Sequence, residues 1–325
     1  MTVWHGDGRL AARTAELLGP RHPVMAVALL ASGQVRVASR GADLDAAFEI
    51  GSISKAVTGL LYADALERAE IRSDSPLGDL LPLGDAPAAS VTLASLSTHR
   101  SGLPSLPKAA HPVRRTIALW RHGTNPYGDD LGQLLAQARS VKVGRPRPRY
   151  SNLGFELLGH AIANPAGLPY AELVHQRIAR PLGLDQCHVP ATAEQLGPND
   201  LIGRSRRGKA RQPWTGEALG PAGGIRASIR DMARLTAALL DGSAPGIAAL
   251  EPLAPFGRGA RIGAGWITVR TGGRRITWHN GGTGGFRSWL GLDRAAGAGA
   301  VILSATSAPV DRHGFVLLRE PVARA

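Results

Sequence analysis

A serine and a lysine stand three residues apart at the start of a segment with helical periodicity. Ser52 and Lys55 are followed by Val57, Leu60 and Leu61, which repeat at the spacing of one helix face. Positions i and i+3 of an α-helix share a face, with Cβ atoms about 5–6 Å apart. A serine hydroxyl becomes nucleophilic when a neighbouring base takes its proton, and a lysine with a lowered pKa can be that base. The spacing therefore predicts nucleophilic catalysis by Ser52, with Lys55 as its base.

Simpler interpretations of this spacing compete with catalysis. Ser52 is a good helix N-cap, and Lys55 would then be a solvated side chain of the first turn. The same spacing also occurs at Ser105 and Lys108, where Pro107 interrupts any long helix because proline lacks an N–H donor and clashes with the preceding turn. We interpret the second pair as part of a loop.

A second polar segment, Tyr150-Ser151-Asn152, precedes another apolar segment with helical periodicity. A phenol held near a cation can become a phenolate and act as a general base, and an adjacent amide can orient a substrate. The simpler alternative is that Ser151 or Asn152 caps the helix while Tyr150 packs as an aromatic side chain.

A third segment, residues 278–286, is rich in glycine and lies at the end of a predicted strand. His279 could donate a hydrogen bond or polarise a substrate there, and the glycines allow a ligand to approach the backbone. The segment lacks the Lys-Ser/Thr pair of a phosphate-binding P-loop, so we predict no nucleotide site.

Composition narrows the classes of function. The chain has 325 residues, of which 44% are hydrophobic and 19% charged, as expected for a large folded enzyme. The net charge is +13, but the arginines are spread along the chain, with one dense basic run at 204–211. Aromatic residues are only 5%, which leaves little material for stacking on bases. We therefore predict no nucleic-acid partner.

Metal and membrane sites are also not expected. The single cysteine, Cys187, excludes an internal disulfide and a thiolate cluster, and the histidines lack metal-ligand spacing, so no metal and no cofactor is predicted. The longest apolar run, residues 24–31, is far shorter than the roughly 20 residues that span a bilayer. The polar residues 1–13 do not resemble a signal peptide, so we expect a cytoplasmic protein with no membrane partner.

The order of the predicted elements suggests how the chain is organised. A hairpin at about 24–39 and a β-rich end after residue 260 enclose a helical, loop-rich middle. We predict that residues 1–75 and 215–325 form one α/β (α+β) domain, that residues 76–214 form an inserted all-helical domain, and that the active site lies in the cleft between them. Strand-like runs are expected at 260–270, 274–279, 286–293 and 299–304.

The three polar segments together resemble the serine β-lactamase and penicillin-binding protein family. Members of that family carry a Ser-x-x-Lys motif, a second polar motif and a Lys-Thr-Gly motif. The corresponding motifs here are Ser52-x-x-Lys55, Tyr150-x-Asn152 and His279-x-Gly281. Further segments that look like the class C branch, which includes esterases and D-amino-acid peptidases, are 93–104, 181–184 and 221–225.

The resemblance implies a fold and a set of roles. The fold would be an antiparallel sheet flanked by helices. Ser52 would attack an ester or amide carbonyl while Lys55 and Tyr150 share its proton. The oxyanion hole would be formed by the backbone N–H groups of Ser52 and Gly282. Asn152 would bind Lys55 or the substrate amide. His279 and Gly281 would line the substrate site.

One departure from the family pattern limits the expected substrate. His279 replaces the lysine that β-lactamases direct at the substrate carboxylate, and a neutral imidazole is a weaker anchor for an anion. We therefore expect a poor β-lactamase that acts on a small-molecule ester or amide. The arginine-rich residues 143–149 are expected to alter the rim of the pocket.

Two alternative functions stay open. A transacylase would pass the acyl group to an amine acceptor instead of water, and no single residue separates it from a hydrolase. A non-catalytic binding protein on the same scaffold would be expected to lack the nucleophile, the lysine or the tyrosine, but all three are present.

Overall fold

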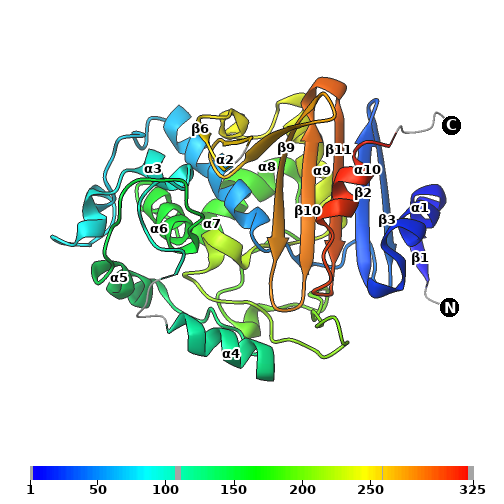
Figure 1. The fold of residues 1–325 in the computed structure, drawn as a ribbon, viewed down its shortest axis with the longest axis horizontal. Coiled ribbons are helices and arrows are strands. Elements are labelled where there is room, and N and C mark those ends of the chain that lie inside the picture. The colour runs from blue at the N-terminus through cyan, green and yellow to red at the C-terminus, as the bar shows by residue number, and fades with distance from the viewer. Residues whose placement is uncertain (1–2, 107–110, 258, 321–325) are drawn as a thin grey trace.

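The main element of the fold is an antiparallel sheet whose strands come from both ends of the chain (Figure 1). The structure is a computed structural model that describes residues 3–106, 111–257 and 259–320. Within those ranges, nine strands form one sheet in which every neighbouring pair is antiparallel. Their order across the sheet is β1 (Trp4–Gly6), β3 (Gln34–Arg40), β2 (Met25–Ala31), β11 (Ala298–Ser304), β10 (Arg287–Asp293), β9 (Arg274–Gly282), β8 (Ile267–Thr271), β7 (Ala260–Ile262) and β6 (Ala254–Pro255).

The two ends of the chain meet in the middle of this sheet. Strand β2 pairs with β11 from Met25 opposite Ser304 to Leu30 opposite Gly299. In Figure 1 the blue N-terminal strands β2 and β3 therefore stand beside the orange C-terminal strands. The predicted fold class, an antiparallel sheet flanked by helices, is confirmed.

Strand β2 shows why residues 24–31 are apolar without interruption. Successive side chains of a strand point to opposite faces. Met25, Val27 and Leu29 belong to the cluster that includes residues of α1 (Gly8–Leu18) and α10 (Asp311–Leu317). The alternate residues Ala26, Ala28 and Leu30 join the larger core with α2 (Ile53–Glu67) and α9 (Ile229–Asp241). Helices thus cover both faces of the strand, and neither face meets water.

The middle of the chain is helical. The described residues of 76–214 form no strand of the sheet, only helices, turns and isolated bridges. Their α-helices are α3 (Leu93–Ser97), α4 (Pro112–His122), α5 (Leu131–Arg139), α6 (Asn152–Ala163), α7 (Tyr170–Val174) and α8 (Arg180–Leu182). Figure 1 shows these cyan and green segments beside the sheet, next to α2. The exact limits proposed for the two domains stay a prediction.

The predicted strand over 260–270 is wrong as a single element. Residues 263–266 turn the chain between β7 and β8, which pair with each other, and Gly265 adopts a left-handed φ of 75° there. The short strand β1 and the C-terminal helix α10 have no strong periodic signal and were not predicted. None of the helices in the described parts of the chain combines the length and apolarity that crossing a bilayer requires.

A glycine in α2 gives a test of this packing. A Cβ added to Gly59 would lie 1.8 Å from the carbonyl oxygen of Ala264, so α2 and the loop before β8 would have to separate. We expect Gly59→Ala to lower the free energy of unfolding by about 1–3 kcal/mol, the usual cost of overpacking. Denaturant unfolding followed by circular dichroism measures this. The matched control is Gly8→Ala, because no atom lies within 4 Å of the added Cβ. Equal stability of the two variants would contradict the packing.

Candidate active site

A tight turn places Ser52 at the start of α2. The preceding strand β4 (Phe48–Glu49) pairs with β5 (Arg226–Ala227), and Ile50 donates its N–H to the carbonyl of Ile225. Gly51 follows with a left-handed φ of 53°, and a Cβ on it would lie 2.6 Å from the backbone nitrogen of Gly282. Only glycine fits such a position. The turn therefore brings the end of β9 directly against the residue before Ser52.

The residue of β9 next to Gly282 also lies close to the turn before Ser52. A Cβ on Gly281 would lie 2.0 Å from the carbonyl oxygen of Ile50. Ser288, which lies opposite Gly281 on β10, donates its hydroxyl to the same oxygen at 2.7 Å. Gly281 and Gly282 thus lie beside Ser52, as their place in the third motif predicts, and Gly281 serves backbone packing as well as the site.

Lys55 is directed at Ser52. Its Nζ donates to Ser52 Oγ at 3.2 Å and to the carbonyl oxygen of Ala222 at 2.5 Å. The side chain is fully buried, and Ser52 makes no side-chain cap hydrogen bond. The solvated-lysine and N-cap interpretations are therefore wrong. Burial lowers the pKa of Lys55 to about 7, against an opposing effect of Glu156. A substantial fraction of the lysine is then a neutral amine at neutral pH.

Tyr150 is the second residue whose side chain contacts Ser52. Its side chain is hydrogen-bonded to that of Ser52, and Lys55 Nζ lies 4.8 Å from the centre of its ring. Burial raises the pKa of Tyr150, with only a smaller opposing effect of the bond to Ser52. Burial thus favours the neutral phenol over the phenolate that was considered from the sequence. Its neighbour Ser151 caps α6 by accepting from the N–H of Gly154 at 2.9 Å.

Asn152 occupies the first turn of α6. Its Nδ2 donates to the hydroxyl of Tyr127 at 3.0 Å, while its Oδ1 is buried and has no partner among the described residues. Of its two predicted roles, binding of Lys55 is not seen. The free Oδ1 is an acceptor that suits an amide N–H of a substrate.

His279 is a hydrogen-bond acceptor toward the site. Its Nδ1 lies 2.6 Å from the carbonyl oxygen of Asn280, which assigns the N–H to Nδ1. Its Nε2 is buried and has no partner in the described part of the chain. Burial, reinforced by Lys55, lowers the pKa of His279 to about 4, so the ring is neutral. The expectation of a donor is thus corrected, while the expectation of a neutral imidazole agrees with its environment.

Two residues near the site were missed from the sequence. His99 is buried against Tyr150, with ring centres 4.6 Å apart, and its Nδ1 accepts from the N–H of Ser151 at 3.2 Å. Glu156, one turn after Asn152, is only 5% exposed. His99 lay in a segment noted only for its family likeness. A lone glutamate in an apolar helix is ordinarily read as solvated.

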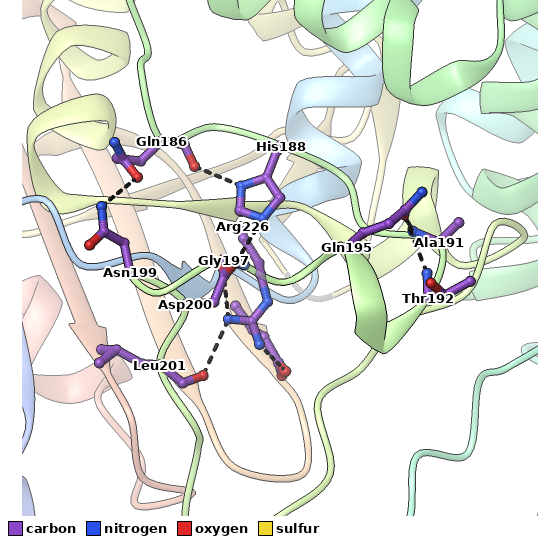
Figure 2. Close-up of polar contacts among 11 residues, drawn as sticks. Gln186, His188, Ala191, Thr192, Gln195, Gly197, Asn199, Asp200, Leu201 and Arg226 are labelled. Carbon is purple, nitrogen blue, oxygen red and sulfur yellow. Dashed lines mark hydrogen bonds and ion pairs between the residues drawn. The ribbon is translucent and has the colours of Figure 1, made fainter.

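A buried ionic cluster supports the strand that leads to Ser52 (Figure 2). Arg226 on β5 is fully buried and donates to Glu49 at 2.9 Å and to Asp200 at 3.2 Å. Asp200 also contacts His188 at 3.2 Å, and Glu49 accepts from the N–H of Trp214 at 2.8 Å. The cluster ties β4 and β5 to the segments that carry Asp200, His188 and Trp214.

The remaining predicted candidates are placed as follows. Lys108 lies outside the described residues, so the second Ser-x-x-Lys pair is not assessed. In the ranges that the structure describes, no three His, Cys, Asp or Glu side chains gather to hold a metal ion. The basic run from Arg204 to Arg211 is an exposed turn that packs beside Gly285.

The state of Lys55 gives a pH prediction. Protonated lysine cannot accept the serine proton, so labelling of Ser52 by a fluorophosphonate should be slow at pH 5 and rise through a pKa of about 7. Intact-mass spectrometry at several pH values measures the rate. Ser52→Ala should not be labelled, and Lys55→Arg should lose the rise because arginine stays protonated. A rise centred near pH 10 would contradict the buried, activated lysine.

The ionic cluster gives a stability prediction. Arg226→Met leaves Glu49 and Asp200 without their buried partner, so we expect a loss of about 3–5 kcal/mol in unfolding free energy. Denaturant unfolding measures it. Arg230→Met is the matched control, since Arg230 pairs with Asp45 at the surface and such pairs contribute about 0–1 kcal/mol. Similar losses in both variants would show that the cluster does not hold the fold.

Comparison with known proteins agrees with this geometry. Residues 10–319 match the family model described as Beta-lactamase. The chain is 29% identical over 165 residues to the D-alanyl-D-alanine-carboxypeptidase/endopeptidase AmpH of Escherichia coli, covering 47% of this chain and 41% of that protein. It is 27% identical over 326 residues to a Beta-lactamase-like protein of Arthroderma benhamiae, covering 87% and 52%. The chain thus spans about half the length of the curated relatives it matches.

A solved structure shows the same fold. The class C β-lactamase from Rhodobacter sphaeroides superimposes with a TM-score of 0.78 over 96% of this chain and 98% of that one, at 23% identity. The family model covers nearly the whole sequence and all three motifs that meet at Ser52. The chain therefore belongs to the β-lactamase family.

Proposed function

We propose that this protein is a serine hydrolase that cleaves an ester or a small amide through an acyl-enzyme on Ser52. The observation that carries the proposal is the buried amine of Lys55, 3.2 Å from Ser52 Oγ, with Tyr150 hydrogen-bonded to the same residue. A nucleophilic hydroxyl beside two side chains that can transfer protons is the arrangement that covalent acyl transfer needs.

The acylation step follows from these contacts. Ser52 Oγ forms a bond to the substrate carbonyl carbon while its proton passes to Lys55, directly or through Tyr150. The neutral phenol of Tyr150 can give its proton to the leaving alcohol or amine and take one from Lys55. The bond to the leaving group then breaks and an ester on Ser52 remains.

Deacylation runs the same proton path in reverse. A water molecule attacks the ester carbon, its proton goes to the Lys55 and Tyr150 pair, and Ser52 Oγ leaves with a proton returned to it. Both carbonyl additions place negative charge on oxygen. The backbone N–H groups of Ser52 and Gly282 are proposed as its donors, supported by the close approach of Gly51 to Gly282. Loss of one such donor typically costs about 2.7–4 kcal/mol.

The substrate class is inferred from the polar side-chain atoms of the site that have no hydrogen-bond partner among the described residues. Asn152 Oδ1 and His279 Nε2 are both acceptors, and both are buried without a described partner. They favour a substrate that presents N–H or O–H donors. The neutral His279 gives a carboxylate no cation to bind, which supports weak action on β-lactams. The Escherichia coli relative is a carboxypeptidase and endopeptidase, which supports an amide among the candidates.

Substrate panels test this proposal. We expect p-nitrophenyl esters to be hydrolysed with a burst of nitrophenol, faster than the β-lactam nitrocefin, because only the latter carries a carboxylate. Ser52→Ala should lower ester turnover on the order of 10³-fold or more. Adding amines to the trapped acyl-enzyme distinguishes hydrolysis from transfer. Turnover that survives in Ser52→Ala, or nitrocefin as the better substrate, would refute the assignment.

A further inference from the structure

We propose that His99 is a positioning residue that holds Tyr150 in reach of Ser52, by bonding the backbone on both sides of Tyr150 and by packing on its ring. His99 lies outside the three motifs, at the end of a different helix. The role assumes that Tyr150 carries protons for Ser52, so it rests on the proposed function. Its first test follows Tyr150 itself and needs no substrate.

His99 stands where helix α3 ends. Its N–H donates to the carbonyl oxygen of Leu96 at 3.0 Å, and the N–H of Arg100 donates to that of Ser95 at 2.7 Å. These are the two bonds of a Schellman motif, and His99 takes its left-handed position with a φ of 55°. Glycine is the usual residue there, because a Cβ is disfavoured at positive φ. Ending α3 therefore requires no histidine, and glycine would do it with less strain.

The backbone on both sides of Tyr150 is bonded to His99. The carbonyl oxygen of His99 accepts from the N–H of Arg149 at 2.9 Å. Its Nδ1 accepts from the N–H of Ser151 at 3.2 Å. Tyr150 thus lies between two residues that are both held by one histidine, and the second of these bonds depends on the side chain. A residue without an acceptor at this place would leave the N–H of Ser151 unbonded.

The imidazole of His99 also packs on the ring of Tyr150. The two ring centres are 4.6 Å apart, and His99 is only 2% exposed. Phe155 and Phe256 surround the same imidazole, with ring centres at 4.7 and 5.8 Å. Lys55 Nζ lies 4.8 Å from the centre of the Tyr150 ring, so the phenol contacts both the histidine and the lysine. A ring packed in this way has little freedom to swing its hydroxyl away from the nucleophile.

The imidazole is in the state that this role needs. A neutral imidazole has one N–H and one acceptor nitrogen, so the bond from Ser151 to Nδ1 assigns the proton to Nε2. Burial, reinforced by the charge of Lys55, lowers the pKa of His99, which keeps Nδ1 free to accept. Nε2 is buried and has no partner in the described ranges, which is itself unfavourable. Phenylalanine would avoid that unpaired N–H and glycine would avoid the left-handed strain, but neither can bond Ser151.

Tyrosine NMR tests the position of Tyr150 directly. The chain has four tyrosines, Tyr62, Tyr127, Tyr150 and Tyr170, so protein labelled with ¹³C at tyrosine Cζ gives four signals. Tyr150→Phe identifies the signal of Tyr150. In His99→Gly, which keeps the Schellman motif, we expect this signal to broaden or split as the phenol samples several positions, while those of Tyr62 and Tyr170 stay sharp. A Tyr150 signal that shifts but stays single and sharp would overturn the proposal.

Ester turnover measures the consequence for the reaction. A misplaced proton carrier slows bond formation at Ser52 without weakening substrate binding, so His99→Gly should lower kcat about 10–100-fold and change KM less than about threefold. His99→Asn should recover at least half of that loss on a logarithmic scale, because asparagine tolerates a left-handed φ and its Oδ1 can accept from the N–H of Ser151. A change confined to KM, or an asparagine variant no better than the glycine variant, would contradict the positioning role.

Ala69 provides a matched control. It takes the same left-handed position, with a φ of 57°, in a second Schellman motif at the end of α2. There the N–H groups of Ala69 and Glu70 donate to the carbonyl oxygens of Leu66 and Ala65, both at 3.0 Å. The side chain of Ala69 is exposed, so Ala69→Gly should leave kcat and the Tyr150 signal unchanged. Equal losses in the two glycine variants would show that the helix ends matter and the imidazole does not.

Two further outcomes are also decisive. If the variants of His99 do not fold, the unmodified protein is tested alone: its ¹⁵N spectrum must show His99 protonated at Nε2, with Nδ1 coupled to the amide of Ser151, and any other state refutes the proposal. Fluorophosphonate labelling of the unmodified protein tests the proposed function separately. Labelled Ser52 together with a sharp Tyr150 signal in His99→Gly refutes only the role of His99. A broadened Tyr150 signal together with unlabelled Ser52 refutes only the hydrolase.

Discussion

The burial of one amine against one hydroxyl is the constraint around which the site is built. A lysine ammonium is strongly hydrated, and placing Lys55 where no water reaches it favours its neutral form. The first turn of α2 supplies Ser52, the π-helical segment Gly220–Gly224 supplies the carbonyl of Ala222, and Tyr150, just before α6, lies close to both Ser52 and Lys55. If any of these segments moved away from Lys55, water would reach the amine and its pKa would return toward the ordinary value of a lysine.

Close backbone contacts lie directly beside this point. Gly51 and Gly281 allow backbone to meet backbone at distances that a Cβ would forbid. Behind them, Arg226 joins Glu49 and Asp200 in an interior ionic cluster. Such clusters contribute little net stability compared with an apolar core, but they do fix orientation because a broken pair leaves a buried charge. Here the fixed element is the strand that ends at the catalytic turn.

The sequence was most informative where periodicity and motif spacing act together. A helical period places Ser52 and Lys55 on one face, and the resemblance of the three motifs to the family added Tyr150, while the β-rich end was predicted from short strand-like runs. The protonation states and hydrogen-bonding roles of the side chains were harder to predict from the sequence. The phenol of Tyr150 and the acceptor face of His279 depend on burial and on one carbonyl oxygen of Asn280, which no local pattern encodes. Glu156 was missed because its burial depends on how α6 packs in the folded protein, and His99 because its contact with Tyr150 joins segments that are distant in sequence.

The pairing of β2 with β11 has a consequence for the order in which the protein can fold. Met25 finds its partner Ser304 only after the chain has been made through residue 304, and contacts of such long range close slowly. Until then the apolar edge of β2 lacks this neighbour, and the strands β8, β9 and β10 are not yet joined to those of the N-terminal part. A nascent chain can therefore carry the nucleophile and its lysine long before it can use them. On the proposed function, acyl transfer requires the assembled sheet.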